Sequence, residues 1–403
     1  MLLLFFLLLL IGFLLCYSRN RKQFNAQYKL WLSVFCIYAV FAFVSNLYIN
    51  NPISEYTFGT NDQLGYYQDA IYYANNYSFT ETLTELSFNF LKTESPMATI
   101  FFSEGIRMAR VLGVEADGWL LFLKLINAFW GSLVILYTYK ILNNRGYSNY
   151  NKALSGLVAF AAFTPIIDSS ISLMRDIHVC AIYTLGFYVA LKDKIRARWL
   201  SLILLGILAL NFRMESGLFF ICIPLVRLYG MYRESKYIGK IAIAIVLLIL
   251  VIPILPYTID TMEMTITRYN ERGIEAASAD SLAVKIVTLF PQPFGAIFMT
   301  LFSFVYPFPL WTVFMDKGAP SYIWMKSISF ATPFFWLPIM IVLIVYVKKY
   351  WGLLDKDVLL CLIIALTYLI ACSWGEMNLR RMIAVYPIIY VGYVMVSQKV
   401  RIN

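Results

Sequence analysis

One polar stretch near the N-terminus carries acidic and phenolic side chains at helical spacing. Positions i, i+4, i+7 and i+11 of a predicted helix share one face, and here they hold Asp62, Tyr66, Asp69 and Tyr73. A carboxylate on such a face can accept a proton from an attacking hydroxyl group. Asp62 is the better candidate for this role, because it follows a Gly59-Thr-Asn turn that can aim it, whereas Asp69 lies in mid-helix. The alternative is that both are solvated surface carboxylates.

A second group of candidates combines arginines with acidic neighbours at the ends of apolar runs. Arg175 and Asp176 begin one such run, where they either stabilise a helix N-terminus as an ion pair or bind an anionic group. Arg213 and Glu215 lie between two apolar runs, where they either pair across a tight turn or contact a ligand. Charged side chains within or beside long apolar segments are costly, which favours a function for them.

Two more arginine pairs are candidates for binding a phosphorylated ligand. One pair alternates with acidic residues on a predicted helix, a pattern that is also typical of an ordinary solvated helix: Arg268, Glu271, Arg272 and Glu275. The other pair, Arg380 and Arg381, precedes the last apolar run. A guanidinium group is a planar fork that matches phosphate oxygens in bidentate fashion, so arginine suits a diphosphate better than lysine does.

The remaining candidate is the one histidine of the chain, His178. It either packs between helices or serves as a proton acceptor, since its unperturbed pKa suits that work. The six cysteines fall in or beside apolar runs, and no pair has the spacing of metal ligands. We therefore expect neither a disulfide framework nor a metal site, and no cofactor.

The composition is that of a polytopic membrane protein. Of the 403 residues, 61% are hydrophobic and 14% are charged, and the mean hydropathy is +0.70. Soluble domains have about 45–50% apolar and about 25% charged residues. The net charge of +10 does not indicate nucleic-acid binding, because most of the excess lysine and arginine falls in short loops, where it sets topology.

The apolar runs, oriented by the basic loops, predict an all-α membrane bundle with the N-terminus outside and the C-terminus inside. The chain forms a single integral membrane domain, 1–403, with about 11 predicted spans: 2–17, 30–49, 119–139, 153–167, 179–191, 199–210, 217–226, 241–257, 329–347, 358–373 and 382–397. Two external intervals, 50–117 and 258–328, are expected to hold short or re-entrant helices. Within the second, the proline-broken stretch 286–315 favours a re-entrant or surface-lying hairpin.

This topology places every candidate residue on the external side. Lysine and arginine are normally retained in cytoplasmic loops, so arginines on the external side suggest a functional role. We expect the outer mouth of the bundle to bring guanidinium groups to face a carboxylate.

The order of these motifs resembles that of the EpsG/Wzy-like polysaccharide polymerases and, more distantly, the GT-C membrane glycosyltransferases. The likeness extends over most of the chain and rests on FGTNDQLGYYQDAIYY, SSISLMRDIHVCAIYTLGFYVALK, LNFRMESGLFF, PQPFGAIFMTLFSFVYPFPLW and EMNLRRMIAVYPII. The resemblance implies an enzyme of the inner membrane, with its active site outside, that polymerises oligosaccharide repeat units carried on undecaprenyl diphosphate. It also implies an Asp base in the first outer loop, the position of Asp62, and arginines on the leaving diphosphate.

Two other functions remain open from the sequence. A GT-C transferase would add a single sugar from a polyprenyl-phosphate donor. A flippase or other transporter of lipid-linked oligosaccharide would show charges at the bilayer midplane and inverted repeats, and neither is apparent. The partners implied by the resemblance are the lipid-linked glycan, membrane lipids and a chain-length regulator, with no nucleic acid.

Overall fold

The computed structural model describes eleven ranges of the chain: 1–47, 61–90, 92–93, 95–146, 150–192, 198–234, 290–291, 293–305, 320–350, 355–373 and 379–402. Every secondary-structure element within these ranges is a helix, which agrees with the predicted all-α class. The predicted span 241–257 and most of the interval 258–328 lie outside the described residues.

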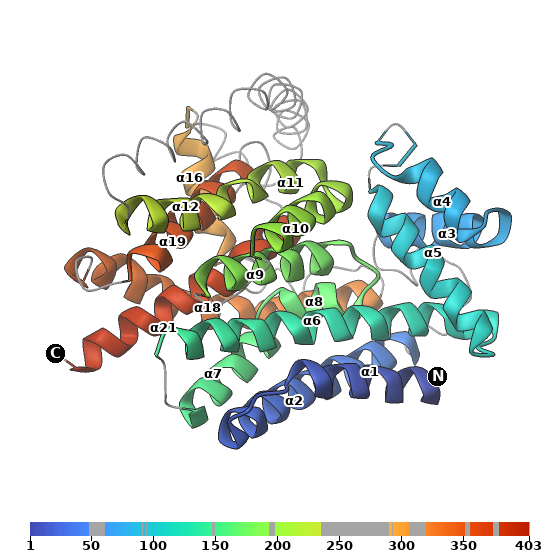
Figure 1. Cartoon of the computed structure of the whole chain (residues 1–403), viewed down its shortest axis with the longest axis horizontal. Helices are drawn as coiled ribbons and strands as arrows, with labels where there is room; N and C mark the ends of the chain where they lie inside the picture. The colour runs from blue at the N-terminus through green and yellow to red at the C-terminus, as the bar shows by residue number, and fades with distance from the viewer. Residues whose placement is uncertain are drawn as a thin grey trace.

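A central helix organises the bundle. Helix α6 (Trp119–Asn144) is apolar all round and is buried along most of its length, as expected for a helix enclosed by others. It packs against α2 (Arg21–Leu47) and α9 (Asp176–Leu191), with α1 (Leu2–Leu15) alongside (Figure 1). Helix α2 begins where the Asn20 side chain accepts hydrogen bonds from the first backbone N–H groups, nine residues before the predicted span.

Three helices of the first long polar interval gather at one end of the bundle. They are α3 (Asn61–Asn76), α4 (Phe79–Leu86) and α5 (Pro96–Val111), and Figure 1 shows them beside the N-terminus and far from the C-terminus. A capping box between Ser78 and Glu81 starts α4, and Pro96 occupies the first turn of α5. We call this the α3 end of the molecule.

One predicted span is broken by a proline. The segment expected at 153–167 ends as α7 (Tyr150–Ala162), and a separate short helix, α8 (Ile166–Ile171), follows Pro165. Proline lacks a backbone N–H and restricts the residue before it, so the helix ends ahead of it.

Helix α10 (Arg198–Phe212) contains the predicted segment 199–210 and stops at Arg213, within the predicted gap before 217. The next predicted segment, 217–226, is divided between α11 (Met214–Phe220) and α12 (Cys222–Glu234).

The C-terminal helices complete the bundle. Helix α18 (Pro320–Tyr350) contains Pro333 and Pro338 and starts nine residues before the predicted 329. Both α18 and α19 (Lys356–Cys372) pack against α21 (Tyr386–Ile402). A short helix α20 (Leu379–Met382) and the 3₁₀ turn η4 (Ile383–Val385) lead into α21. Of the predicted hairpin 286–315, the described part includes one helix, α16 (Phe294–Ser303).

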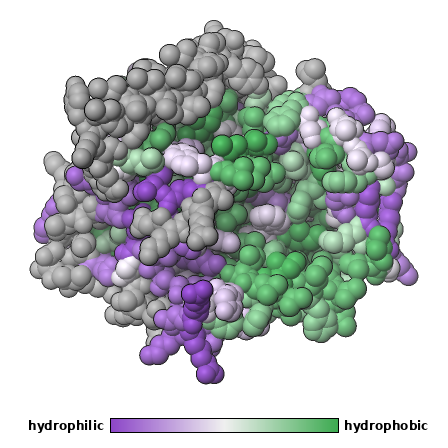
Figure 2. Space-filling view, viewed as in Figure 1, coloured by the Kyte–Doolittle hydropathy of each residue, from purple (hydrophilic) through white to green (hydrophobic). Residues whose placement is uncertain are grey.

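Within the described ranges, three helical segments are long and apolar enough to cross a membrane: Arg21–Asn46, Ala116–Asn144 and Met214–Tyr232. Shorter apolar helices accompany them, among them α1, α9 and α10. Apolar side chains also cover much of the surface seen in Figure 2, whereas hydrophilic residues gather over α3 and α4. The chain is therefore a helical bundle with candidate membrane-spanning helices.

At the end opposite to α3, one arginine joins three helix termini. The Arg145 guanidinium lies 2.6 Å from Asp355 and 3.7 Å from Asp357 at the start of α19, and it also donates to the Leu191 carbonyl that ends α9. Lys140 of α6 donates to the carbonyl of Leu15, at the end of α1. We call this the Arg145 end.

Candidate functional site

The break between α10 and α11 brings Arg213 into the interior of the protein. Arg213 is the N-cap of α11 with extended backbone, and the turn is tight: a Cβ atom on Gly217 would lie 2.2 Å from the Cα of Leu210. The Arg213 guanidinium lies 2.8 Å from Oδ1 of Asp176, and both side chains are almost fully buried. Asp176 stands in the first turn of α9, where the helix dipole favours a negative charge.

Arg175 precedes this aspartate and is held by a loop that is fixed from two sides. The Asn127 side chain of α6 donates to the carbonyls of Ser172 and Met174, at 2.8 and 3.2 Å. From α3, the Gln63 side chain accepts a hydrogen bond from the backbone N–H of Leu173 at 3.1 Å. The buried Arg175 guanidinium then lies over the ring of Tyr66, 5.8 Å from its centroid.

Asp62 and Arg380 form an ion pair at the α3 end. Their side chains are 56% and 40% exposed, and Oδ2 of Asp62 lies 2.9 Å from Nη1 of Arg380. The same Nη1 atom lies 3.6 Å from the sulfur of Met174. Asp62, in the first turn of α3, is therefore paired with an arginine of α20 that is distant in the sequence.

A polar network among four helices sets the position of Arg381. Tyr183 of α9 donates to the Ser216 carbonyl of α11, and the Ser216 hydroxyl lies 3.2 Å from the Tyr368 hydroxyl of α19. Tyr368 in turn donates to the Arg381 carbonyl at 3.3 Å. The Arg381 guanidinium interacts electrostatically with Arg213, Glu215, Asp176 and Arg175.

These groups make up one charge cluster at the α3 end: Arg175, Arg213, Arg380, Arg381, Asp62, Asp176 and Glu215. Four guanidinium groups lie here among carboxylates, and Arg175 and Arg213 are buried. Buried like charges repel one another, so a bound anion would stabilise them. The cluster is suited to holding a phosphate or diphosphate beside a solvent-accessible carboxylate.

Sequence reasoning missed a further carboxylate, that of Asp168 in α8. Oδ1 of Asp168 is buried without a hydrogen-bond partner, and its carboxylate interacts electrostatically with Arg380. Burial raises the pKa of Asp168 to about 7, although the positive charge of Arg380 opposes this shift. The signal that could have found it is an acidic residue directly after the apolar run that ends in Pro165-Ile-Ile.

Asp69 lies away from the charge cluster, further along α3. It remains accessible to solvent, and desolvation by neighbouring atoms raises its pKa. Its electrostatic neighbour is Tyr73, one turn further along the same helix. The structure therefore brings Asp62, and not Asp69, into contact with an arginine.

His178 lies in an aromatic surrounding. Its ring stacks on Phe212 with the centroids 5.0 Å apart, and the edges of other rings close around it: Phe101, Phe102 and Trp130. The side chain is buried, and neither ring nitrogen has a hydrogen-bond partner. This position favours the packing role of His178 over proton transfer.

Two of the predicted site residues, Arg268 and Arg272, lie outside the described residues. Within the described ranges, no group of three or more histidine, cysteine, aspartate or glutamate side chains is arranged to hold a metal ion. All six cysteines are free thiols.

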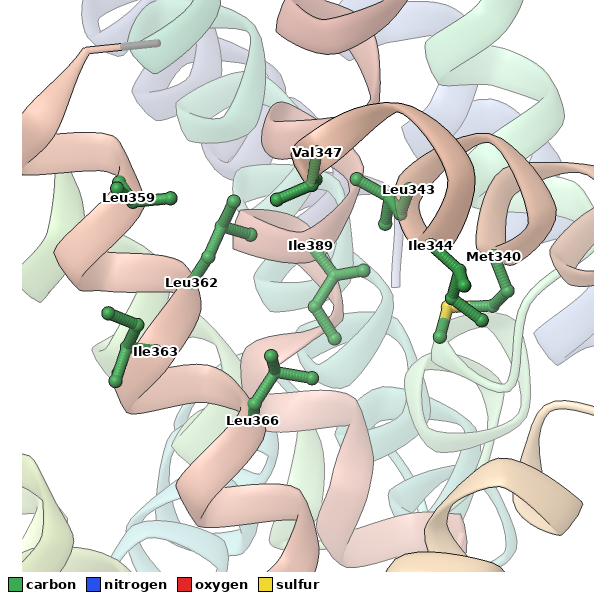
Figure 3. A pocket seen from close by; sticks show the side chains of 9 residues that line it. All are labelled: Met340, Leu343, Ile344, Val347, Leu359, Leu362, Ile363, Leu366 and Ile389. Carbon is green, nitrogen blue, oxygen red and sulfur yellow. The ribbon is translucent and has the colours of Figure 1, made fainter. Parts of the chain in front are cut away.

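An apolar cavity of about 630 Å³ lies between α18 and α19, and α21 contributes one residue to its lining (Figure 3). Nine aliphatic or thioether side chains line it: Met340, Leu343, Ile344, Val347, Leu359, Leu362, Ile363, Leu366 and Ile389. This lining offers no group for acid–base chemistry and suits a hydrocarbon chain. Helix α21 connects this cavity with the charge cluster, because it carries Ile389 and is joined through η4 to α20 and its two arginines.

Comparison with known proteins gives no relative from which a function could be transferred. No family model matches the chain, no curated protein is significantly similar to it, and no solved structure matches its fold. A proposal for its function therefore depends on the residues and their geometry.

Proposed function

We propose that the protein is a membrane glycosyltransferase that polymerises oligosaccharide repeat units carried on undecaprenyl diphosphate into a surface polysaccharide. One observation carries the proposal: the charge cluster combines four arginines with an exposed carboxylate, Asp62, at one end of a bundle of apolar helices. Such a site holds a lipid-linked anion next to a group that can take a proton.

In the proposed reaction, a hydroxyl of one lipid-linked glycan attacks the anomeric carbon of the sugar bound to the diphosphate of another. The new glycosidic C–O bond forms as the bond from that carbon to the phosphate oxygen breaks. Asp62 takes the hydroxyl proton, and undecaprenyl diphosphate leaves with the electron pair. The charge that develops on the leaving phosphate is stabilised by Arg175, Arg213 and Arg380.

The exposed ion pair between Asp62 and Arg380 is the resting form of this site. Exposed pairs contribute only about 0–1 kcal/mol to stability, so an incoming phosphate can replace the carboxylate on Arg380. This exchange would release Asp62 for proton transfer at the moment when the substrate binds. The buried pair between Arg213 and Asp176 would stay in place as the fixed part of the site.

The proposal also sets the orientation of the protein. The α3 end faces the outside of the inner membrane, and the Arg145 end, with the C-terminus, faces the cytosol. About 11 segments of the chain are expected to cross the bilayer. The apolar cavity at α18 and α19 then lies at membrane depth, where it suits the polyprenyl tail of the substrate.

The decisive experiment compares three variants in the host strain: Asp62→Asn, Arg175→Ala and Arg213→Ala. Polysaccharide is separated on gels, and membrane levels of each variant are measured by immunoblot. The proposal expects the ladder of long chains to disappear and single lipid-linked repeat units to accumulate. Long chains from all three variants at normal protein levels would refute it.

A second candidate function is a GT-C transferase that adds one sugar from a polyprenyl-phosphate donor. The exposed Asp62 beside Arg380 favours it equally, because the same acid–base and phosphate chemistry applies. Analysis of the product separates the two: a polymer ladder supports the polymerase, and one added sugar per acceptor supports the transferase.

A further inference from the structure

A group of three tyrosine rings lies at the C-terminal end of α3, beyond the charge cluster: Tyr72 and Tyr73 in the last turns of the helix, and Tyr77 directly after it. Their ring centroids are 5.2–6.0 Å apart; Tyr72 is 52% exposed and the other two are half-buried. We call these three rings the tyrosine platform. A cluster of accessible rings on a polar face offers contact area to a partner.

The platform is held by a guanidinium group behind it. Nη2 of Arg107, on α5, donates to the carbonyls of Tyr73 and Tyr77 at 2.8 and 2.7 Å, and to the Thr82 hydroxyl at 2.9 Å. Arg107 also pairs with Glu104 on its own helix. The C-terminal turn of α3 and the start of α4 are thereby fixed, so the rings form a preorganised surface.

The surroundings of the platform are polar and carry both charges. Tyr73 interacts electrostatically with Asp69, Glu85 and Lys92, and the last two form an exposed ion pair. Hydrophilic residues cover this part of the surface in Figure 2. Carboxylates next to the rings disfavour an anionic lipid surface. The ring planes are inclined to one another, by 88° between Tyr72 and Tyr73 and by 36° between Tyr73 and Tyr77, so they do not share one flat face. Apolar rings among hydrogen-bonding groups suit a sugar, whose ring has apolar C–H faces and a rim of hydroxyls.

The position of the platform relates it to the charge cluster. Asp62 and Tyr73 lie eleven residues apart on α3, which corresponds to about 16 Å along the helix axis. A glycan whose diphosphate lies on the arginines would pass along α3, over Tyr66 and Asp69, and reach these rings after a few sugar units. The helix provides a path from the reacting end of the saccharide to the platform.

We infer that the tyrosine platform at the end of α3 is a glycan-binding subsite that holds the saccharide chain of the lipid-linked substrate through contacts of sugar rings with Tyr72, Tyr73 and Tyr77. The inference rests on the proposed function and adds to it the surface that guides the chain. It assigns these residues to binding, so their loss weakens retention of the chain and shortens the polymer while the reaction itself continues.

The test measures saccharide binding by the full-length protein in lipid nanodiscs. The probe is the oligosaccharide released by mild acid from the lipid-linked repeat units that accumulate when the gene is deleted in its host. Alanine at Tyr72, Tyr73 and Tyr77 together is expected to weaken binding by about tenfold or more, since three lost aromatic contacts are of that order. Tyr72→Phe keeps the ring and is expected to stay within about threefold.

The matched control is Tyr17→Ala, which removes a 71% exposed tyrosine elsewhere on the protein. Equal loss of affinity in this control, unchanged affinity in the triple variant, or no binding by the wild-type protein would each refute the subsite. A circular dichroism spectrum of the triple variant confirms that its helices remain. If the gene deletion leads to no accumulation of lipid-linked saccharide, the proposed function fails instead, so the two failures are distinguishable.

Discussion

The two ends of the bundle use arginine in different ways. At the Arg145 end, the Arg145 guanidinium lies between two carboxylates and a carbonyl that terminates a helix, and Lys140 bonds another helix-terminating carbonyl. At the α3 end, four arginines lie among the carboxylates of Asp62, Asp168, Asp176 and Glu215. The cations at the first end each bond a helix terminus, whereas the arginines at the second end also lie close to one another.

This difference separates structural from functional charges. Arg145 joins α6, α9 and α19 through its contacts with helix termini. The charge cluster gains nothing in stability from bringing like charges together, since repulsion and desolvation both oppose it. We therefore propose that the Arg145 end is structural and that the α3 end binds an anion, and the following predictions test that division.

The largest effect is expected for Arg213→Ala. The change leaves Asp176 buried without its ion pair, which costs about 3–5 kcal/mol of unfolding free energy, and it removes a phosphate-binding group. Polymer formation is expected to fall by at least about 100-fold. Thermal unfolding in detergent and polymer gels measure the two effects. Full activity in Arg213→Ala would place Arg213 with the structural charges.

A smaller effect, confined to activity, is expected for Arg380→Ala. Its pair with Asp62 is exposed, so unfolding free energy should change by less than about 1 kcal/mol. Polymer formation should nevertheless fall by about 100-fold, because the lost group binds the leaving phosphate. Arg380→Lys keeps the charge without the planar fork and should recover part of this loss. A variant with normal stability and normal activity would contradict the division between the two ends.

The reverse result is expected for Arg145→Ala. Loss of two carboxylate contacts and one carbonyl contact should lower the unfolding free energy by about 1.5–3 kcal/mol. Activity per folded molecule should stay near that of the wild type at a temperature where both are folded. A loss of specific activity comparable with that of Arg380→Ala would show that the Arg145 end also serves the reaction.

The smallest effect is a change in pH dependence from Asp168→Asn. Burial raises the folded-state pKa of Asp168 to about 7, above the unfolded value of about 3.9, so the folded state binds the extra proton between these values. Stability should therefore fall as pH rises from about 4 to about 7. The amide side chain of the variant cannot ionise, so the variant should be more stable than the wild type at pH 8 and unchanged near pH 4. Unfolding measured at both pH values tests this, and identical pH profiles would exclude it.

Local sequence patterns predicted several helices and the gap at Arg213, but not every break. Long apolar runs predicted α1, α6 and α9 within a few residues of their observed bounds. In apolar surroundings a helix satisfies the backbone hydrogen bonds within the segment itself. The break before Pro165 was missed, although proline there offers a local reason. The start of α18 was misplaced because its N-terminal turns continue the helix beyond the apolar run.

The candidate site was predictable as a set of residues but not as a set of contacts. The excess of arginine beside apolar runs was visible in the sequence, yet nothing local indicates that Arg213 pairs with Asp176 or that Arg380 meets Asp62. These pairs depend on how α3, α9, α11 and α20 pack together. The surroundings of His178 and the enclosed carboxylate of Asp168 likewise follow from tertiary packing.

The pairing of Asp62 with Arg380 has a consequence for biogenesis. Asp62 is synthesised long before Arg380, so this pair cannot form until α20 has been made. A nascent chain therefore displays α3 to its surroundings while it still lacks two of the guanidinium groups.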